Sequence, residues 1–391
     1  MSFIVKCQLK TKFVLMIITT FATLIRKKML ILFIIITLIL LFLLITNLPV
    51  FGALPKGLRM QSIQQLSNYR DGALQNLSIT PMQPEGVSFF KILKAFFFQR
   101  DSERIPKKAL TFIQPDLDGV NESNAPELIW FGHSSYLIKI NGLRILIDPV
   151  FSQTPSPFSF LGSKAFPGTG FVKAEDFTDI DVVLITHDHY DHLDYQSILK
   201  IAPKTKKILV SLGIGSHLER WGIDRNKIEE ISWNQSTTVF NNLTFTAVPA
   251  RHFTGRKFKR NQTLWSAFVL QTENWKLFLG GDSGYDTHFA TIGEKFGPFD
   301  IALLECGQYN AYWPYIHMFP EETVQAAIDL KARVLMPVHW AKFSLAMHSW
   351  NEPVERVVNE AEKQNLKIVT PKLGETVVLN HYYPTAKWWL D

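Results

Sequence analysis

Thr186-His187-Asp188-His189-Tyr190-Asp191-His192-Leu193-Asp194 is the stretch of this 391-residue sequence that decides the fold. It directly follows the apolar run Val182-Val183-Leu184-Ile185, which is typical of a buried strand. A cluster of histidines and carboxylates at the end of such a strand lies at the edge of a sheet. Imidazole nitrogens and carboxylate oxygens are ligands for zinc and similar ions. So many ligand-type side chains in one short loop predict a metal site rather than a plain surface loop.

Three further ligand candidates also follow predicted strands. His252 comes after residues 247–251, Asp282 comes after Leu279-Gly280-Gly281, and His339 comes after residues 335–338. A lone histidine at a strand end is usually no ligand, but together these residues occupy one rim of the predicted sheets. That is where a site for two metal ions would need them.

The basic excess of the sequence is confined to its N-terminus. The net charge of the chain is +6, and the first acidic residue is Asp71. Residues 1–28 alone carry six positive charges: Lys6, Lys10, Lys12, Arg26, Lys27 and Lys28. The remainder is therefore formally neutral, which argues against a nucleic-acid partner. With only Cys7 and Cys306 present, the chain has no disulfide framework.

Residues 29–51 are predicted to form a transmembrane anchor. Met29 to Thr46 is almost entirely Leu, Ile and Phe, and with residues 47–51 it reaches the about 20 residues that span a bilayer. Phe51-Gly52-Ala53 is a poor cleavage site, so we favour an uncleaved anchor over a signal peptide. The basic cluster before the span predicts a single-pass protein with its catalytic domain on the exported side. Whether translation begins at Met1 or at Met29 stays open.

The sequence therefore divides into a basic tail (1–28), an anchor (29–51), a stalk and lead-in (52–120) and a hydrolase domain (121–391). Within the lead-in, Phe89 to Phe98 interleaves bulky apolar residues with two lysines. This pattern is typical of a helix on a membrane surface, and it equally fits a helix packed on the domain.

The hydrolase domain is predicted to be α/β, with sheets at the centre and helices outside. Three strands within residues 128–147 come first, and the Asn141-Gly142 dipeptide predicts a hairpin between the second and third. Helices and strands then alternate up to a helix over residues 353–364. Pro320-Glu321-Glu322 is a good helix start, since proline suits the first helical position and acidic residues suit the first turn.

The complete pattern resembles the metallo-β-lactamase superfamily. Over roughly residues 125–380 it is similar to the group of phospholipases D that hydrolyse N-acylphosphatidylethanolamine. The matching segments are Trp130-Phe131-Gly132-His133, residues 147–152, Gly281-Asp282-Ser283-Gly284-Tyr285, residues 296–300, His317 with Pro320-Glu321-Glu322, and Val338-His339-Trp340. The resemblance implies a four-layer αβ/βα sandwich, and the anchor predicted from residues 29–51 precedes it. Residues 305–310 and the basic loop after His252 depart from the animal sequences.

The resemblance also implies roles for single residues. His187, His189 and His252 would bind one zinc ion, Asp191, His192 and His339 would bind the other, and Asp282 would bridge them; other divalent metals remain alternatives.

Asp191 would also orient the nucleophile, so that it is catalytic with Asp282 and His317. His317 would meet the substrate phosphate or assist the leaving group, or it is simply a surface histidine before a helix. Asp148 and His133 would support the ligands, although His133 could equally be a core residue. Tyr190 and Arg256 are our further candidates for substrate binding, although the basic residues after His252 could simply be solvated.

We therefore expect a membrane-anchored, zinc-dependent phosphodiesterase of phospholipase D type. It would act on N-acylphosphatidylethanolamine or a related phospholipid through a hydroxide shared by two zinc ions. The animal relatives also imply a homodimer. Two alternatives stay open: a lactonase or other carboxyl-ester hydrolase of the same fold, and a non-catalytic membrane module. The complete set of seven ligands disfavours the module.

Overall fold

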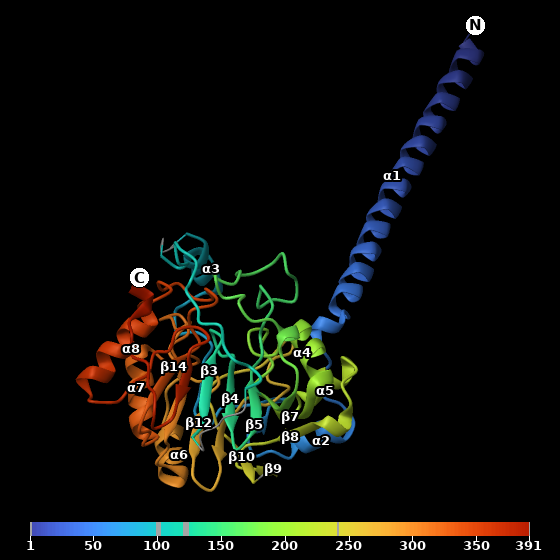
Figure 1. Ribbon diagram of the computed structural model, residues 1–391. Coiled ribbons are helices and arrows are strands. Elements are labelled where there is room, and N and C mark those ends of the chain that lie inside the picture. The colour runs from blue at the N-terminus through green and yellow to red at the C-terminus, as the bar shows by residue number, and fades with distance from the viewer. Residues whose placement is uncertain (1, 99–102, 120–124, 241, 391) are drawn as a thin grey trace. The chain divides into compact units, whose positions relative to one another are not determined.

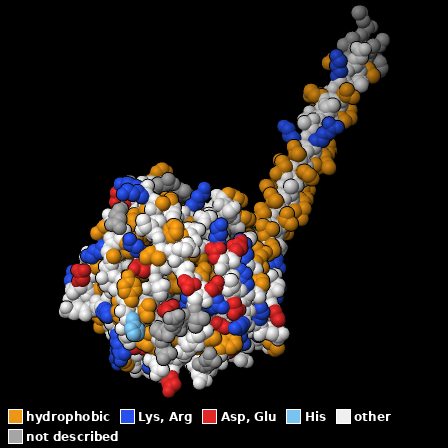
Figure 2. Space-filling view, in the orientation of Figure 1, with side chains coloured by type: hydrophobic (Ala, Val, Ile, Leu, Met, Phe, Trp, Pro, Cys, Tyr) orange, Lys and Arg blue, Asp and Glu red, His pale blue; other side chains and the backbone are white. Residues whose placement is uncertain are grey.

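The computed structural model describes residues 2–98, 103–119, 125–240 and 242–390. Two compact units make up the chain, Met1–Phe51 and Gly52–Asp391. The first unit contains one long helix, α1 (Ser2–Thr46), and a short 3-10 turn at Pro49–Phe51. Within α1, Cys7–Thr46 is long and apolar enough to cross a membrane. Figure 2 shows hydrophobic side chains along its visible face. The helix runs through Arg26, Lys27 and Lys28 without a break, because arginine and lysine are good helix formers.

A seven-stranded sheet forms the first half of the second unit. Its strand order is β15-β3-β4-β5-β6-β7-β8. The strands are β3 (Glu127–Trp130), β4 (Tyr136–Ile140), β5 (Leu143–Ile147), β6 (Ile180–Ile185), β7 (Thr205–Ser211), β8 (Ile228–Ile231) and β15 (Thr376–Val378). Strand β6 lies between β5 and β7 and is parallel to both. All of its residues are buried, which explains why the sequence before the histidine cluster is a continuous apolar run.

A six-stranded sheet forms the second half, with the order β14-β13-β12-β11-β10-β9. Its strands are β9 (Ser236–Val239), β10 (Leu243–Val248), β11 (Ala267–Gln271), β12 (Lys276–Leu279), β13 (Ile301–Glu305) and β14 (Leu335–Val338). Strands β9 to β12 are antiparallel, whereas β12, β13 and β14 are parallel. Pro337 is accommodated because β14 is an edge strand, where one side of the backbone makes no ladder bonds.

Helices cover the outer faces of both sheets, as Figure 1 shows. The helices α4 (Tyr195–Ile201) and α5 (Gly215–Arg220) pack on the seven-stranded sheet. On the six-stranded sheet lie α6 (His288–Phe296), α7 (Pro320–Asp329) and α8 (Glu352–Lys363). The expected four-layer αβ/βα sandwich is thus confirmed.

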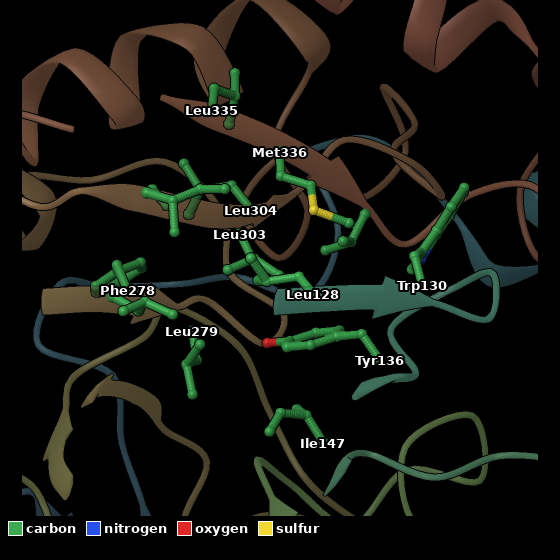
Figure 3. Packing of buried hydrophobic residues seen from close by; sticks show 14 of the residues in the cluster. Leu128, Trp130, Tyr136, Ile147, Phe278, Leu279, Leu303, Leu304, Leu335 and Met336 are labelled. Atoms are coloured by element: carbon green, nitrogen blue, oxygen red, sulfur yellow. The ribbon is translucent and has the colours of Figure 1, made fainter. Parts of the chain in front are cut away.

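The two sheets meet in one hydrophobic core. Leu128, Tyr136 and Ile147 of the first sheet pack against residues such as Phe278 and Leu303 of the second (Figure 3). Alternate residues of the first sheet face its helices instead, because side chains along a strand point to opposite faces. This packing fixes the distance between the sheets and therefore the separation of side chains at their common rim.

The turn between β4 and β5 has the predicted form. Ile140 pairs with Leu143, so that only Asn141 and Gly142 connect the strands. Both have positive φ values, 51° and 74°, which is the conformation that a two-residue type I′ turn requires.

The expected stalk is part of the second unit. The lead-in contains α2 (Gly57–Gln64), the short hairpin β1 (Tyr69–Arg70) and β2 (Ala73–Leu74), and α3 (Phe89–Phe98). Ile63 and Leu74 are fully buried and pack with Leu264 and Trp265 of the domain. Arg59 also pairs with Glu230 at 2.6 Å. Through these contacts α2 and the β1–β2 hairpin pack on the domain instead of forming a stalk; residues 99–102 and 120 lie outside the described residues.

Candidate metal centre

The ligand candidates converge at one rim of the sandwich, because each follows the carboxyl end of a strand. The loop after β6 supplies His187 to His192, and β10, β12 and β14 are followed by His252, Asp282 and His339. The ring nitrogens and carboxylate oxygens form two main groups. The first is His187, His189, His252 and Asp282, and the second is His133, Asp191, His192 and His339. The residues that the sequence places in separate segments are therefore brought together.

The first group is closely packed around the Nε2 atoms of two histidines. His189 Nδ1 lies 3.0 Å from His187 Nε2 and 3.2 Å from His252 Nε2. Asp282 Oδ2 lies 3.7 Å from each of the same two Nε2 atoms. Four lone-pair atoms at these separations face a common point.

The second group lies around the other carboxylate oxygen of Asp282. Asp282 Oδ1 is 3.1 Å from His192 Nε2 and 3.2 Å from His339 Nδ1. Asp191 Oδ2 is 3.8 Å from His192 Nε2. Since Oδ2 faces the first group and Oδ1 the second, Asp282 joins the two groups as a bridging ligand would.

Glycines before Asp282 allow this close approach. Gly281 has a φ of 59°, and a Cβ atom there would lie 3.0 Å from Cβ of Thr186. At Gly280 a Cβ atom would lie 2.7 Å from the carbonyl oxygen of Leu303. A side chain at Gly281 would push the end of β12 away from Thr186 and the ligand loop, whereas one at Gly280 would push it away from β13.

Metal ions fit this arrangement. His192 Nε2, His339 Nε2 and Asp282 Oδ1 are buried and make no hydrogen bond, although buried polar atoms are almost always paired. Burial raises the pKa of Asp282 to about 6 even though the charge of His192 opposes this shift. Burial also lowers the pKa of His189 to about 4, so its ring is neutral at pH 7, as a ligand must be. The nitrogen and oxygen donors suit zinc and neighbouring ions.

Hydrogen bonds behind the ligands determine which ring nitrogen faces the site. His192 Nδ1 donates to Asp148 Oδ2 at 2.8 Å, and His252 Nδ1 donates to the Ile316 carbonyl oxygen at 2.8 Å. The Thr186 hydroxyl donates to Asp148 at 2.7 Å and so accepts from His187 Nδ1 at 3.0 Å. Each of the three rings therefore presents Nε2 to the site. Asp148 thus contacts His192 directly and His187 through the Thr186 hydroxyl, behind the ligand atoms.

His133 lies against Asp191. Its Nε2 is 2.9 Å from Asp191 Oδ2, and its ring lies 3.9 Å from that of His339, centroid to centroid. Burial lowers the pKa of His133 to about 4, despite the opposing effect of Asp191. A neutral His133 can donate from Nε2 and hold the Asp191 carboxylate in place.

Tyr190 and Arg256 lie away from the cavity that opens on the ligands. The Tyr190 hydroxyl donates to the Arg256 carbonyl oxygen at 2.9 Å, and the Arg256 guanidinium lies over the Tyr190 ring at 4.0 Å. Arg256 is only 5% exposed and donates to the carbonyl oxygens of Asp188 and Leu193. Their contacts thus brace the ligand loop, and we propose positioning roles for both in place of substrate binding.

The cavity above the ligands measures about 290 Å³. Its polar walls include Arg260, Gln308 and His317 in addition to the ligands. Its apolar walls come from the lead-in and from the loops after β10, before α7 and after β14. The apolar lining residues are Met82, Ile92, Phe253, Trp313, Ile316 and Leu345. Arg260 belongs to the basic residues after His252, and charge spacing alone does not show which guanidinium of that loop faces the cavity.

Asp188 lies between His187 and His189 in the sequence, and its hydrogen bonds connect the site to the first residues of the second unit. It accepts from Gly255 N–H at 2.8 Å, from the Thr263 hydroxyl at 2.9 Å and from His217 Nε2 at 3.2 Å. His217 Nδ1 in turn accepts from the backbone N–H of Ala53 at 3.1 Å. Sequence reasoning missed His217, because a single histidine in a helix carries no pattern.

Two linked histidine–carboxylate clusters at the rim of this sandwich define a metal-dependent hydrolase. Residues 143–340 match the family described as beta-lactamase superfamily domain. The chain belongs to the metallo-β-lactamase superfamily, as the resemblance indicated.

Two relatives and one solved structure are similar to this chain. A protein of Mycobacterium tuberculosis is 38% identical over 330 residues, which cover 83% of this chain and 88% of that one. The N-acyl-phosphatidylethanolamine-hydrolyzing phospholipase D 1 of Caenorhabditis elegans is 30% identical over 307 residues, 73% of this chain and 86% of its own. The structure of a possible metal-dependent hydrolase from Veillonella parvula is 18% identical with a TM-score of 0.53, covers 66% of this chain and 100% of its own, and supports the fold alone.

Replacing Asp148 with Asn should weaken metal binding by about 10- to 100-fold. Both carboxylate oxygens of Asp148 accept hydrogen bonds from Thr186 or His192, and an amide has only one oxygen that can accept them. Competition with a chromophoric chelator measures this affinity. Asp181→Asn is the matched control, since Asp181 is also buried but bonds Arg144 and Lys206 away from the ligands. Equal affinities for parent and Asp148→Asn would contradict the supporting role.

The metal-free chain should lose stability as the pH falls from about 6.5 to about 4. Burial lowers the pKa of His133, His189 and His288 to about 4, so the unfolded chain binds more protons than the folded chain in this range. The raised pKa values of Asp282 and Glu305 oppose this effect but are outnumbered by the buried histidines. Thermal unfolding of EDTA-treated protein measures the trend, and a midpoint that rises toward pH 5 would contradict it.

Proposed function

We propose that this protein is a zinc-dependent phosphodiesterase of phospholipase D type. Its substrate would be N-acylphosphatidylethanolamine or a related phospholipid. The observation that carries the proposal is the pair of buried ligand groups joined by Asp282 beneath a cavity with apolar walls and one guanidinium. The similarity to the Caenorhabditis elegans phospholipase supports the substrate class.

The residues of the site would have separate roles in hydrolysis. His187, His189 and His252 would hold one ion, Asp191, His192 and His339 the other, and Asp282 both. Zinc bound in this way supplies an acidic water and a Lewis acid for a phosphoryl oxygen. Asp191, oriented by His133, would accept a hydrogen bond from the attacking water and align it with phosphorus. His317, which lines the cavity beside His252 and His339, would meet the phosphodiester group.

The cavity walls fit a lipid with an anionic headgroup. Arg260 is an exposed guanidinium over the Phe253 ring at 5.1 Å, and it lines the same cavity as the ligands. A guanidinium suits a phosphodiester oxygen, because its planar donors match phosphate geometry. Ile92, Met82 and Trp313 would contact the apolar chains.

We also propose that the protein is anchored in a membrane. The apolar part of α1 from Met29 to Thr46 would span the bilayer, and the basic residues before it would stay on the cytoplasmic side, leaving the hydrolase domain on the exported side. Helix α3 supports a role at a lipid surface. Its Ile92 lines the cavity, whereas Phe90 and Phe98 are 78% and 81% exposed, and Lys91 and Lys94 are also exposed.

Zinc-loaded full-length protein in mixed micelles should convert N-acylphosphatidylethanolamine to phosphatidic acid and an N-acylethanolamine. Asp282→Asn should lower the rate by at least about 100-fold, because one oxygen of the bridging carboxylate becomes an amide. Mass spectrometry of both products measures turnover. A protein that holds two ions yet leaves this lipid intact while cleaving lactones would refute the phosphodiesterase and support the carboxyl-ester alternative.

Arg260→Gln should raise KM for anionic phosphodiesters about 10-fold with little change in kcat. The substitution removes a charged contact that would stabilise the bound substrate and the transition state equally. Steady-state kinetics separate the two parameters. Lys259→Gln is the control, since Lys259 is its exposed basic neighbour and does not line the cavity. A similar KM change in both variants would show a general charge effect instead.

A further inference from the structure

Glu305 is a fully buried carboxylate at the end of β13, directly behind the cavity wall. Its Oε1 accepts from the backbone N–H of Ser283 at 2.9 Å and from that of Met318 at 3.3 Å. Its Oε2 lies 2.6 Å from His317 Nδ1. Ser283 follows the bridging residue Asp282, and Met318 follows His317. Glu305 therefore ties together the two loops that meet at the cavity.

This carboxylate is not arranged as a metal ligand, although it lies near Asp282 and His339. Both of its oxygens already have partners, whereas the ligand atoms of the second group include buried atoms without any. The hydrogen bonds explain how a carboxylate is kept in the core: two backbone donors and one ring nitrogen replace water.

The ring of His317 has little freedom beyond this bond. Its centroid lies 5.0 Å from that of His252 and 5.3 Å from that of His339, with which it is stacked at 18°. With Nδ1 held by Glu305, Nε2 is the nitrogen left to face the cavity that His317 lines.

We propose that Glu305 is a positioning residue for the reaction: it keeps a proton on Nδ1 of His317 and so presents Nε2 to the phosphodiester group of the substrate. The inference rests on the proposed function for its substrate. With its proton on Nδ1, a neutral ring has a lone pair at Nε2. When the ring takes up a second proton there, the Glu305 carboxylate stabilises the resulting imidazolium, which gives charge-assisted hydrogen bonds to phosphoryl oxygens.

Glu305→Gln tests the assignment because the amide has only one possible orientation. The two backbone donors require its oxygen on their side, so its NH₂ group must point to His317 Nδ1. The ring must then accept at Nδ1 and lose its proton there. Magic-angle-spinning NMR of ¹⁵N-histidine-labelled full-length protein in lipid, with and without zinc, reports the state of Nδ1, and a His317→Ala sample assigns the signal. A protonated Nδ1 in the parent and an unprotonated one in the variant is the expected result; the same state in both overturns the proposal.

Kinetics show whether this arrangement serves the reaction. Glu305→Gln should lower kcat about 10- to 100-fold with KM within about 3-fold, because the charge on the phosphoryl group grows toward the transition state. In a His317→Ala background the same substitution should have no further effect. A further loss in that background would show that Glu305 merely supports the fold.

Glu322→Gln is the matched control, since Glu322 accepts from Phe319 N–H nearby without touching the ring. It should leave both kcat and the Nδ1 signal unchanged. If the zinc-loaded protein cleaves only carboxyl esters, the proposed phosphodiesterase fails, but the NMR comparison and the double-variant cycle on that ester still decide the role of Glu305.

Discussion

The site depends on the Asp282 carboxylate, because one of its oxygens lies in each of the two ligand groups. It can do so only where β12 ends close to the loop after β6, and these elements come from different sheets. The packing of the sheets therefore determines the geometry of the chemistry. Gly281 keeps that approach open, and the apolar residues between the sheets keep it constant.

Several charges are buried at this junction at once, and the surrounding network shows how the fold tolerates them. Asp148, Asp188 and Glu305 each accept several hydrogen bonds, most of them from backbone or hydroxyl donors. Asp191 and Asp282 have fewer such donors and lie among the histidines instead. The carboxylates that support the site are thus satisfied by the protein, whereas those that face the cavity are left for cations and substrate.

Much of the fold and the centre could be predicted from the sequence, because their signals are local. The apolar run of β6 before the histidine cluster, the Asn141-Gly142 turn and the isolated ligands after strand ends each combine residue type with position. Strands β8, β9 and β15 carry no such signal, since each has only three or four residues and little alternation. The lead-in was misjudged because Ile63 and Leu74 find their partners far along the chain. For the same reason, spacing could not separate Arg256 from Arg260 or connect Glu305 with His317.

The order of the ligands along the chain has a consequence for assembly. The first group needs only β6, β10 and β12, and it is complete once residue 282 has been placed. The second group also needs His339, which follows β14, the edge strand of its sheet. The two halves of the centre therefore differ in how much of the chain they require: the first needs only the residues up to Asp282, whereas the second also needs the 57 residues that follow, as far as His339.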